Sequence, residues 1–191
     1  ETVFINPYPG GAGNWYVSFN RRDEVASLGA RIECALQGEP PQRPEIYPKA
    51  SGRLLRTYRT AIAATGEYTQ YHGGTRADAL SAIAVVMHRI NGVFRRELAV
   101  EFELVADNDR VIFTDPVSDP YDVDDRYGMW LRNQAILDSV IGSPNYDHGH
   151  LFLTGPGGAV RDFGTVCRND IKAQGLSGYP WPAGEVFAVD L

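Results

Sequence analysis

Lysine, cysteine and long apolar runs are all scarce in this chain of 191 residues. Lysine occurs only at Lys49 and Lys172, and the formal net charge is -6. A nucleic-acid-binding surface needs clustered lysine and arginine, so the charge argues against that function. No apolar run approaches the roughly 18 residues that cross a bilayer, so the sequence predicts no membrane span.

What is present is the composition of an ordinary globular protein. Hydrophobic residues make up 43% of the chain and charged residues 22%, which is typical neither of disorder nor of a membrane protein. The length allows one full domain with an appendage. The first residue is Glu1 rather than Met, which is compatible with an export signal having been removed upstream.

The two cysteines, Cys34 and Cys167, stand far apart in the sequence. Both thiols could be buried separately, because a free cysteine packs as a small apolar side chain. In an exported protein they could instead form a disulfide, whose closed loop would stabilise the fold by about 5 kcal/mol on the chain-entropy model. The residues alone leave both alternatives open.

The N-terminal stretch is rich in residues that favour turns. Proline and glycine recur through residues 7–13 and again through residues 38–52. Two short segments between them, 15–19 and 25–34, are candidate strands. We therefore predict that residues 1–53 form an N-terminal extension, or the remnant of a pro-region, with a linker at 38–52. Residues 54–191 would form the main domain.

Apolar spacing predicts the elements of that domain. Residues 54–64 alternate as in a half-buried strand. Thr75, with Asp78 three positions later, has the pattern of a helix start. The residues predicted to form the buried face of this helix are Leu80, Ile83, Ala84, Met87, Ile90 and Phe94.

The remaining elements follow in an order that indicates the fold class. Alternation at 98–104 and a short apolar run at 110–114 predict two strands. Residues 129–141 predict a second helix, and 148–154 predict a last strand. Strand, helix, strand, strand, helix, strand is an α/β order, and we expect a mixed, mostly parallel sheet with two main helices.

His148 and His150 give the sharpest local signal of chemistry. Positions i and i+2 of a strand face the same way, so both imidazoles could converge on one metal. A complete site needs further ligands, and His72 and His88 stand in no recognisable ligand spacing. We therefore predict no metal ligand in the chain, with a small metal enzyme built on the histidine pair as an alternative.

An acidic run extends from Asp115 to Asp125. Its five carboxylates could bind calcium, which favours oxygen-rich loops. The spacing fits no EF-hand, and we favour a solvated loop that places acid near the start of the second helix, where the helix dipole stabilises it. The glycines at 155–158 lack the pattern of a phosphate loop, and no G-x-S-x-G serine-hydrolase motif occurs.

Several blocks of sequence carry a family resemblance. Residues 145–158 read N-Y-D-H-G-H-L-F-L-T-G-P-G-G, followed by G-T-V-C at 164–167, K-A-Q-G-L-S-G at 172–178 and F-A-V-D-L at 187–191. Earlier blocks are L-R-T-Y-R at 55–59 and A-A-T-G-E-Y at 63–68. In this order they resemble the upper part of the catalytic domain of bacterial reprolysin-like zinc metallopeptidases, a branch of the metzincins.

The resemblance implies a fragment of a secreted, bacterial zinc endopeptidase. In the family, a segment like 187–191 leads directly into the zinc-binding helix H-E-x-x-H-x-x-G-x-x-H, which this chain does not contain. A zinc-activated water would hydrolyse the peptide bond in the complete parent protein. The zinc ligands and the catalytic glutamate would lie beyond Leu191, so no catalytic residue is predicted here and the chain alone should be inactive.

The resemblance also implies partners and roles for particular residues. Peptide or protein substrate would bind an exposed sheet edge at 148–154, and the missing C-terminal half of the domain would be a second partner. Cys34 could cap the zinc, as cysteines of metzincin propeptides do, and Cys167 could pair with a cysteine in the missing half. The residues expected to bind substrate are His150, Leu151, Phe152, Leu153, Thr154 and Gly155.

A second class of function stays open. The same fold could serve as a non-catalytic binding or structural module, using its sheet edge or its acidic face. A gene that ends at Leu191, or continues without H-E-x-x-H, would favour this alternative.

Overall fold

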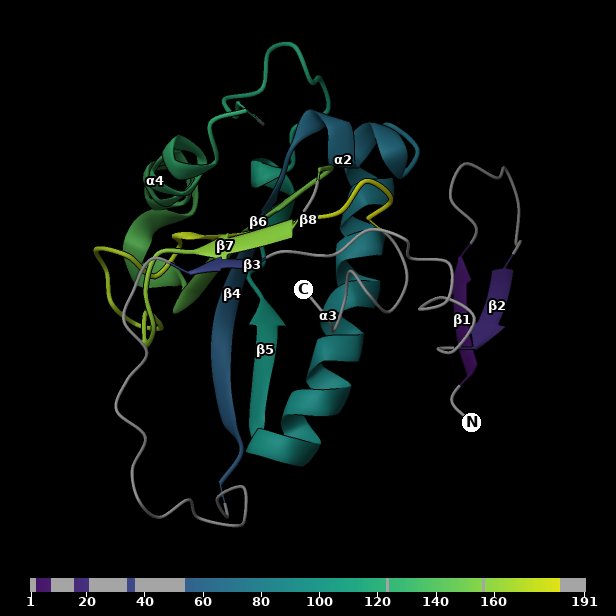
Figure 1. The fold of residues 1–191 in the computed structure, drawn as a ribbon. Coiled ribbons are helices and arrows are strands. Elements are labelled where there is room, and N and C mark those ends of the chain that lie inside the picture. The colour runs from purple at the N-terminus through teal and green to yellow at the C-terminus, as the bar shows by residue number, and fades with distance from the viewer. Residues whose placement is uncertain are drawn as a thin grey trace.

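A computed structural model describes residues 3–7, 16–20, 34–36, 54–122, 124–155 and 157–182. Its centre is a six-stranded sheet with the strand order β3-β7-β8-β6-β4-β5 (Figure 1). The strands are β3 (Cys34–Leu36), β4 (Arg56–Ala64), β5 (Val100–Leu104), β6 (His148–Leu153), β7 (Gly157–Val160) and β8 (Gly175–Gly178). In the described residues, no helix is both long and apolar enough to cross a membrane.

Strand directions confirm the predicted fold class. Four of the neighbouring pairs are parallel, namely β4–β5, β4–β6, β6–β8 and β3–β7. The pair β7–β8 is antiparallel. The sheet is therefore mixed and mostly parallel, with helices between its strands, as the element order indicates.

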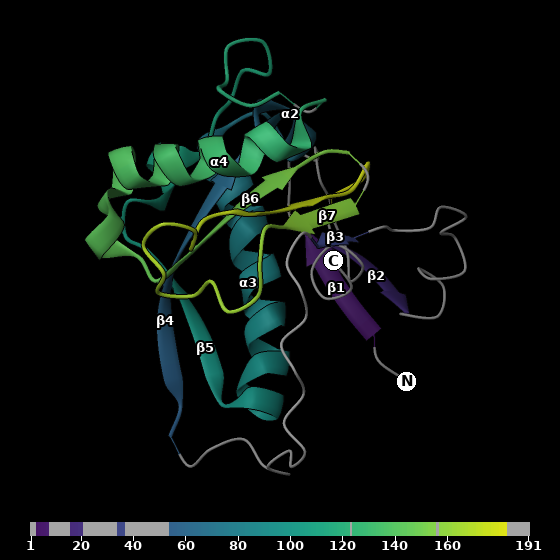
Figure 2. The ribbon, with the colours of Figure 1, turned by 60° about the vertical axis from the view of Figure 1, so that its left-hand side comes forward.

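The two main helices pack on opposite faces of this sheet, α3 (Arg76–Leu98) against one and α4 (Arg126–Leu137) against the other (Figures 1 and 2). Alternation along β4 and β6 divides their side chains between two apolar clusters. Ile62 and Phe152 pack with α3, whereas Ala63 and Leu151 pack with α4. Leu153 packs on the same side as Leu151, opposite Phe152.

Helix α3 begins where the sequence predicts. The Thr75 hydroxyl accepts a hydrogen bond from the Asp78 main-chain N–H at 3.1 Å and donates to the Asp78 carboxylate at 2.6 Å. The helix passes through Gly92 and ends at Leu98, and the C-cap residue Ala99 has a left-handed φ of 52°. The predicted buried face is wrong at Ala84, which is exposed, while Ala79 and Val86 are buried.

Helix α4 starts three residues before the predicted position. The Asp125 carboxylate accepts a hydrogen bond from the Gly128 N–H at 2.9 Å and so caps the helix. After Leu137 the chain widens into a π-helical turn at Asp138–Gly142, followed by a 3-10 turn at Ser143–Asn145. A short helix, α2 (Gly66–Tyr71), follows β4 directly and was not predicted.

The predicted strand at 110–114 is wrong. Residues Asn108–Val111 form a 3-10 turn, and Ile112 makes only an isolated bridge to Ala64. The Asn108 side chain explains this, because it donates to the Ile62 carbonyl at 2.9 Å and accepts from the Ile62 N–H at 2.7 Å. One amide side chain thus takes the place of a strand residue along the edge of β4 beyond β5.

The described parts of the N-terminal region contain three strands. β1 (Val3–Pro7) was not predicted and pairs antiparallel with β2 (Tyr16–Asn20), which matches the candidate strand at 15–19. β3 adds to the main sheet. The candidate strand at 25–34 and the linker at 38–52 lie outside the described residues, apart from Cys34 itself.

Candidate functional site

β6 is an interior strand, so the predicted exposed edge at 148–154 is wrong. Thr60–Ala64 of β4 pairs with residues 148–152 on one side, and Leu176–Gly178 of β8 pairs with residues 151–153 on the other. Main-chain groups that hold neighbouring strands are not available to a peptide. The sequence missed β8 because it reads Gly-Leu-Ser-Gly, which has too little apolar alternation to predict a strand.

The strand that lies near the outer edge of the sheet, where residues 148–154 were expected, is β7. β7 is antiparallel to β8 on its inner side, and among the residues that the structure describes, the three residues of β3 pair with its outer side. In register, Cys34 lies opposite Gly158, Ala35 opposite Ala159 and Leu36 opposite Val160. A short strand from more than 100 positions earlier in the sequence therefore covers the outer edge of the sheet at β7.

The start of β6 is held by long-range polar contacts. The Asp147 carboxylate accepts from the Arg59 main-chain N–H at 2.9 Å and from its guanidinium at 2.7 and 3.1 Å. The Arg59 guanidinium lowers the pKa of the Asp147 carboxyl. The sequence does not reveal this contact, since no local pattern identifies a partner 88 positions away.

A buried lysine fixes the loop that leads into β6. Lys172 is 2% exposed, and its ammonium donates to the carbonyls of Ser143 and Tyr146 and to the Asn169 side chain. It also lies over the Tyr146 ring, 4.2 Å from the centroid. Burial lowers the pKa of Lys172. The contacts are structural and connect two loops that the sequence alone could not pair.

The two histidines of β6 lie together under α3 rather than in an open site. Their rings stack with centroids 5.9 Å apart, and the His148 ring is 5.6 Å from that of Phe102. His150 Nε2 lies 2.9 Å from the Ser177 hydroxyl. Burial lowers the pKa of His148 to about 4 and that of His150 to about 3, the latter also because His148 is adjacent. Both rings are therefore neutral at pH 7.

The histidine pair does not form a metal site with its neighbours. Among the residues that the structure describes, no three side chains of His, Cys, Asp or Glu gather in a way that could hold an ion. His72 Nε2 lies 3.0 Å from the Pro182 carbonyl, and His88 is exposed on α3. The described part of the chain therefore does not fit a zinc ion.

The acidic run binds main-chain N–H groups. Asp119 accepts from the Gly66 N–H at 2.6 Å and the Tyr121 N–H at 2.8 Å, while Asp125 caps α4. Burial raises the pKa of Asp119. These contacts agree with the interpretation that acid lies near the start of the second helix, and they give the carboxylates structural roles.

Cys167 is free and exposed, with a left-handed φ of 65°. Its main-chain N–H donates to the Asp147 carbonyl at 2.8 Å, so this loop packs beside the start of β6. The expectation that both cysteines are either bridged or buried is wrong for Cys167. The side chain of Cys34 lies outside the described residues.

Comparison with known proteins gives the family. Residues 55–189, more than two thirds of the chain, match the family described as metallo-peptidase family M12B, reprolysin-like. No curated protein matches the chain. The family match covers the sheet from β4 onward and both main helices, which are the elements that the resemblance predicted. The chain therefore belongs to the reprolysin-like M12B metallopeptidases, a family of zinc-dependent proteases.

Proposed function

We propose that the chain is part of a secreted zinc endopeptidase whose peptide substrates add to the outer edge of β7. The family match over residues 55–189 supports peptide hydrolysis as the chemistry. The observation that supports the binding surface is the position of β7, which pairs with β8 on one side and, within the described part of the chain, with the short strand β3 on the other.

Peptide addition to this edge is supported by strand geometry. An extended peptide binds a sheet edge through main-chain hydrogen bonds, and its alternate side chains enter pockets on either face. Over the described residues, β3 pairs with β7 through three positions. We infer that β3 occupies this edge as a removable cover and that substrate takes its place.

Zinc is assigned to a segment outside these 191 residues. The described side chains do not gather a ligand set, and the segment at 187–191 resembles the one that leads into the zinc helix of the family. The gene should therefore continue within a few residues into H-E-x-x-H-x-x-G-x-x-H. A stop codon after Leu191, or a continuation without that motif, would instead favour a non-catalytic peptide-binding module.

The role of β3 can be tested by weakening its pairing. Ala35→Pro removes one main-chain donor and disfavours β3 on the sheet. Binding of a labelled extended peptide, measured by fluorescence polarisation, should strengthen several-fold. Ile5→Pro, in the separate β1–β2 pair, is the control and should leave the affinity unchanged. Equal affinity in Ala35→Pro and the unsubstituted protein would mean that the peptide does not use the β7 edge.

A further inference from the structure

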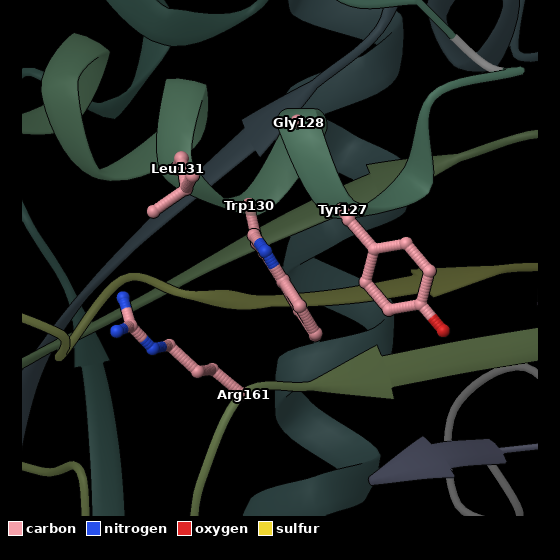
Figure 3. A pocket seen from close by; sticks show the side chains of 5 residues that line it. All are labelled: Tyr127, Gly128, Trp130, Leu131 and Arg161. Carbon is pink, nitrogen blue, oxygen red and sulfur yellow. The ribbon is translucent and has the colours of Figure 1, made fainter. Parts of the chain in front are cut away.

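β7 ends beside an open hollow of about 450 Å³ between α4 and the sheet. Figure 3 shows its side chains, with those of α4 on one side and the arginine that follows β7 on the other. The hollow is lined by Tyr127, Gly128, Trp130, Leu131 and Arg161.

Strand alternation directs Arg161 to the α4 side of the sheet. Ala159, two positions earlier, packs in the same apolar cluster as Trp130 of α4. The Arg161 main-chain N–H donates to the Gln174 carbonyl at 3.1 Å and so extends the β7–β8 pairing by one residue. The guanidinium donates to the Gln174 side chain at 2.8 Å, which fixes the arginine at the hollow.

The guanidinium retains most of its hydrogen-bonding capacity. A guanidinium has five N–H donors, and the only side-chain bond of Arg161 within the described residues uses one of them. No carboxylate in the described part of the chain forms an ion pair with it. Arg161 therefore presents an uncompensated positive charge, whose best partner is a carboxylate bound through two N–H groups.

The other walls of the hollow are apolar and accessible. Tyr127 is 54% exposed and Leu131 is 52% exposed, whereas Trp130 beneath them is buried. The rings of Tyr127 and Trp130 are 5.2 Å apart in an edge-to-face arrangement. Two apolar walls beside one cation suit a side chain with an aliphatic stem and a carboxylate end, which is the chemistry of glutamate.

The register connects this hollow with the β7 edge. A strand on the outer side of β7 would lie about 4.8 Å away, and residues opposite Ala159 point to the same face as Ala159. In the structure Ala35 of β3 takes that position. A peptide residue there, or at the next position on the same face, would lie beside Arg161.

We propose that Arg161 and the hollow form a specificity subsite for a glutamate side chain of a peptide bound to β7. This inference rests on the proposed function. The overall charge bears on this proposal, because a chain of net charge -6 repels acidic peptides in general. A preference for glutamate at a single peptide position would therefore have to come from a local cation.

Cleavage of a peptide library by the full-length protein tests the subsite. Peptides with glutamate at one position should be favoured over their glutamine counterparts by about tenfold in kcat/KM, as expected for one charge-assisted contact. Arg161→Gln should abolish this ratio, and Arg161→Glu should reverse the preference toward lysine or arginine. Arg96→Gln removes another exposed arginine, on α3, and should keep the ratio.

A binding measurement separates this inference from the proposed function. Two labelled peptides that differ only by glutamate or glutamine are titrated into the same protein and its Arg161→Gln variant. A glutamate advantage lost in the variant supports the subsite even if no cleavage occurs, in which case the proposed catalysis alone fails. An equal advantage in both proteins, or none in either, overturns the subsite.

Discussion

The Asp147 carboxylate binds both the main chain and the guanidinium of Arg59, a residue 88 positions earlier. The Asp147 N–H also donates to the Arg59 carbonyl at 2.8 Å. These contacts join the entrance of β6 to the middle of β4 and set the register of the two central strands.

Replacing Asp147 by asparagine should lower stability slightly, and less at acid pH than at neutral pH. The pKa of Asp147 is lowered in the folded state, so its contribution is present above the ordinary pKa near 3.8 and is lost as the pH falls through the lowered value. The pair is partly exposed, so we expect a decrease in Tm of only a few degrees. Thermal unfolding at pH 7 and pH 3 measures this; an equal decrease at both would contradict the ionic interpretation.

Replacing Lys172 by methionine should destabilise the fold by about 3 kcal/mol. The substitution keeps much of the side-chain volume but leaves the Ser143 and Tyr146 carbonyls and the Asn169 side chain without their donor. Urea unfolding gives the free energy. Arg168→Gln, at a neighbouring exposed position, is the control and should change stability by less than about 0.5 kcal/mol.

Replacing either of two helical glycines by alanine should change the stability of the fold, in opposite directions at the two positions. A Cβ on Gly66 would lie 2.3 Å from the main-chain nitrogen of Pro116, so Gly66→Ala should cost about 2–3 kcal/mol. A Cβ on Gly92 would meet nothing within 4 Å, so Gly92→Ala should stabilise α3 by about 0.5–1 kcal/mol. The difference in urea midpoint between the two variants is the measurement. Equal effects would show that the close approach of α2 to the acidic loop is incorrect.

Acid should destabilise the protein through the histidines under α3. The pKa values of His148 and His150 are about 4 and 3 in the folded chain, against 6.5 ordinarily, so the unfolded chain binds more protons as the pH falls. The contribution of the two neutral histidines to the free energy of unfolding is present above about pH 6.5 and decreases toward pH 4. From pH 7 to pH 5 each histidine accounts for a loss on the order of 2 kcal/mol.

His148→Leu separates this effect from other titrations. His148 Nδ1 is buried without a hydrogen-bond partner in the described structure, so leucine removes a titrating group without breaking a bond there. The variant should lose less stability on acidification than the unsubstituted protein. His88→Leu, on the exposed side of α3, is the control and should follow the original curve. Identical acid curves for all three proteins would contradict the prediction.

Local patterns predicted the elements that have strong periodicity or a side-chain cap. Thr75 identified the start of α3, and alternation identified β4 and β5. The sequence could not indicate β8, because Gly-Leu-Ser-Gly has little side-chain pattern, and without β8 the interior strand β6 was predicted to be an edge. Arg161 carries no local signal either, since its relation to α4 arises only from tertiary packing.

The Asn108 side chain closes a stretch of the β4 edge that strand pairing leaves open. Its buried amide satisfies both main-chain groups of Ile62 where β5 has ended, and the Ile112–Phe113 segment covers the next position at Ala64. A leucine at position 108 would leave the N–H and C=O of Ile62 unsatisfied in the apolar Ala-Ile-Ala-Ala stretch of β4. Such an opening is a template for intermolecular strand pairing. Replacing Asn108 by leucine should therefore both lower stability and promote aggregation at high protein concentration.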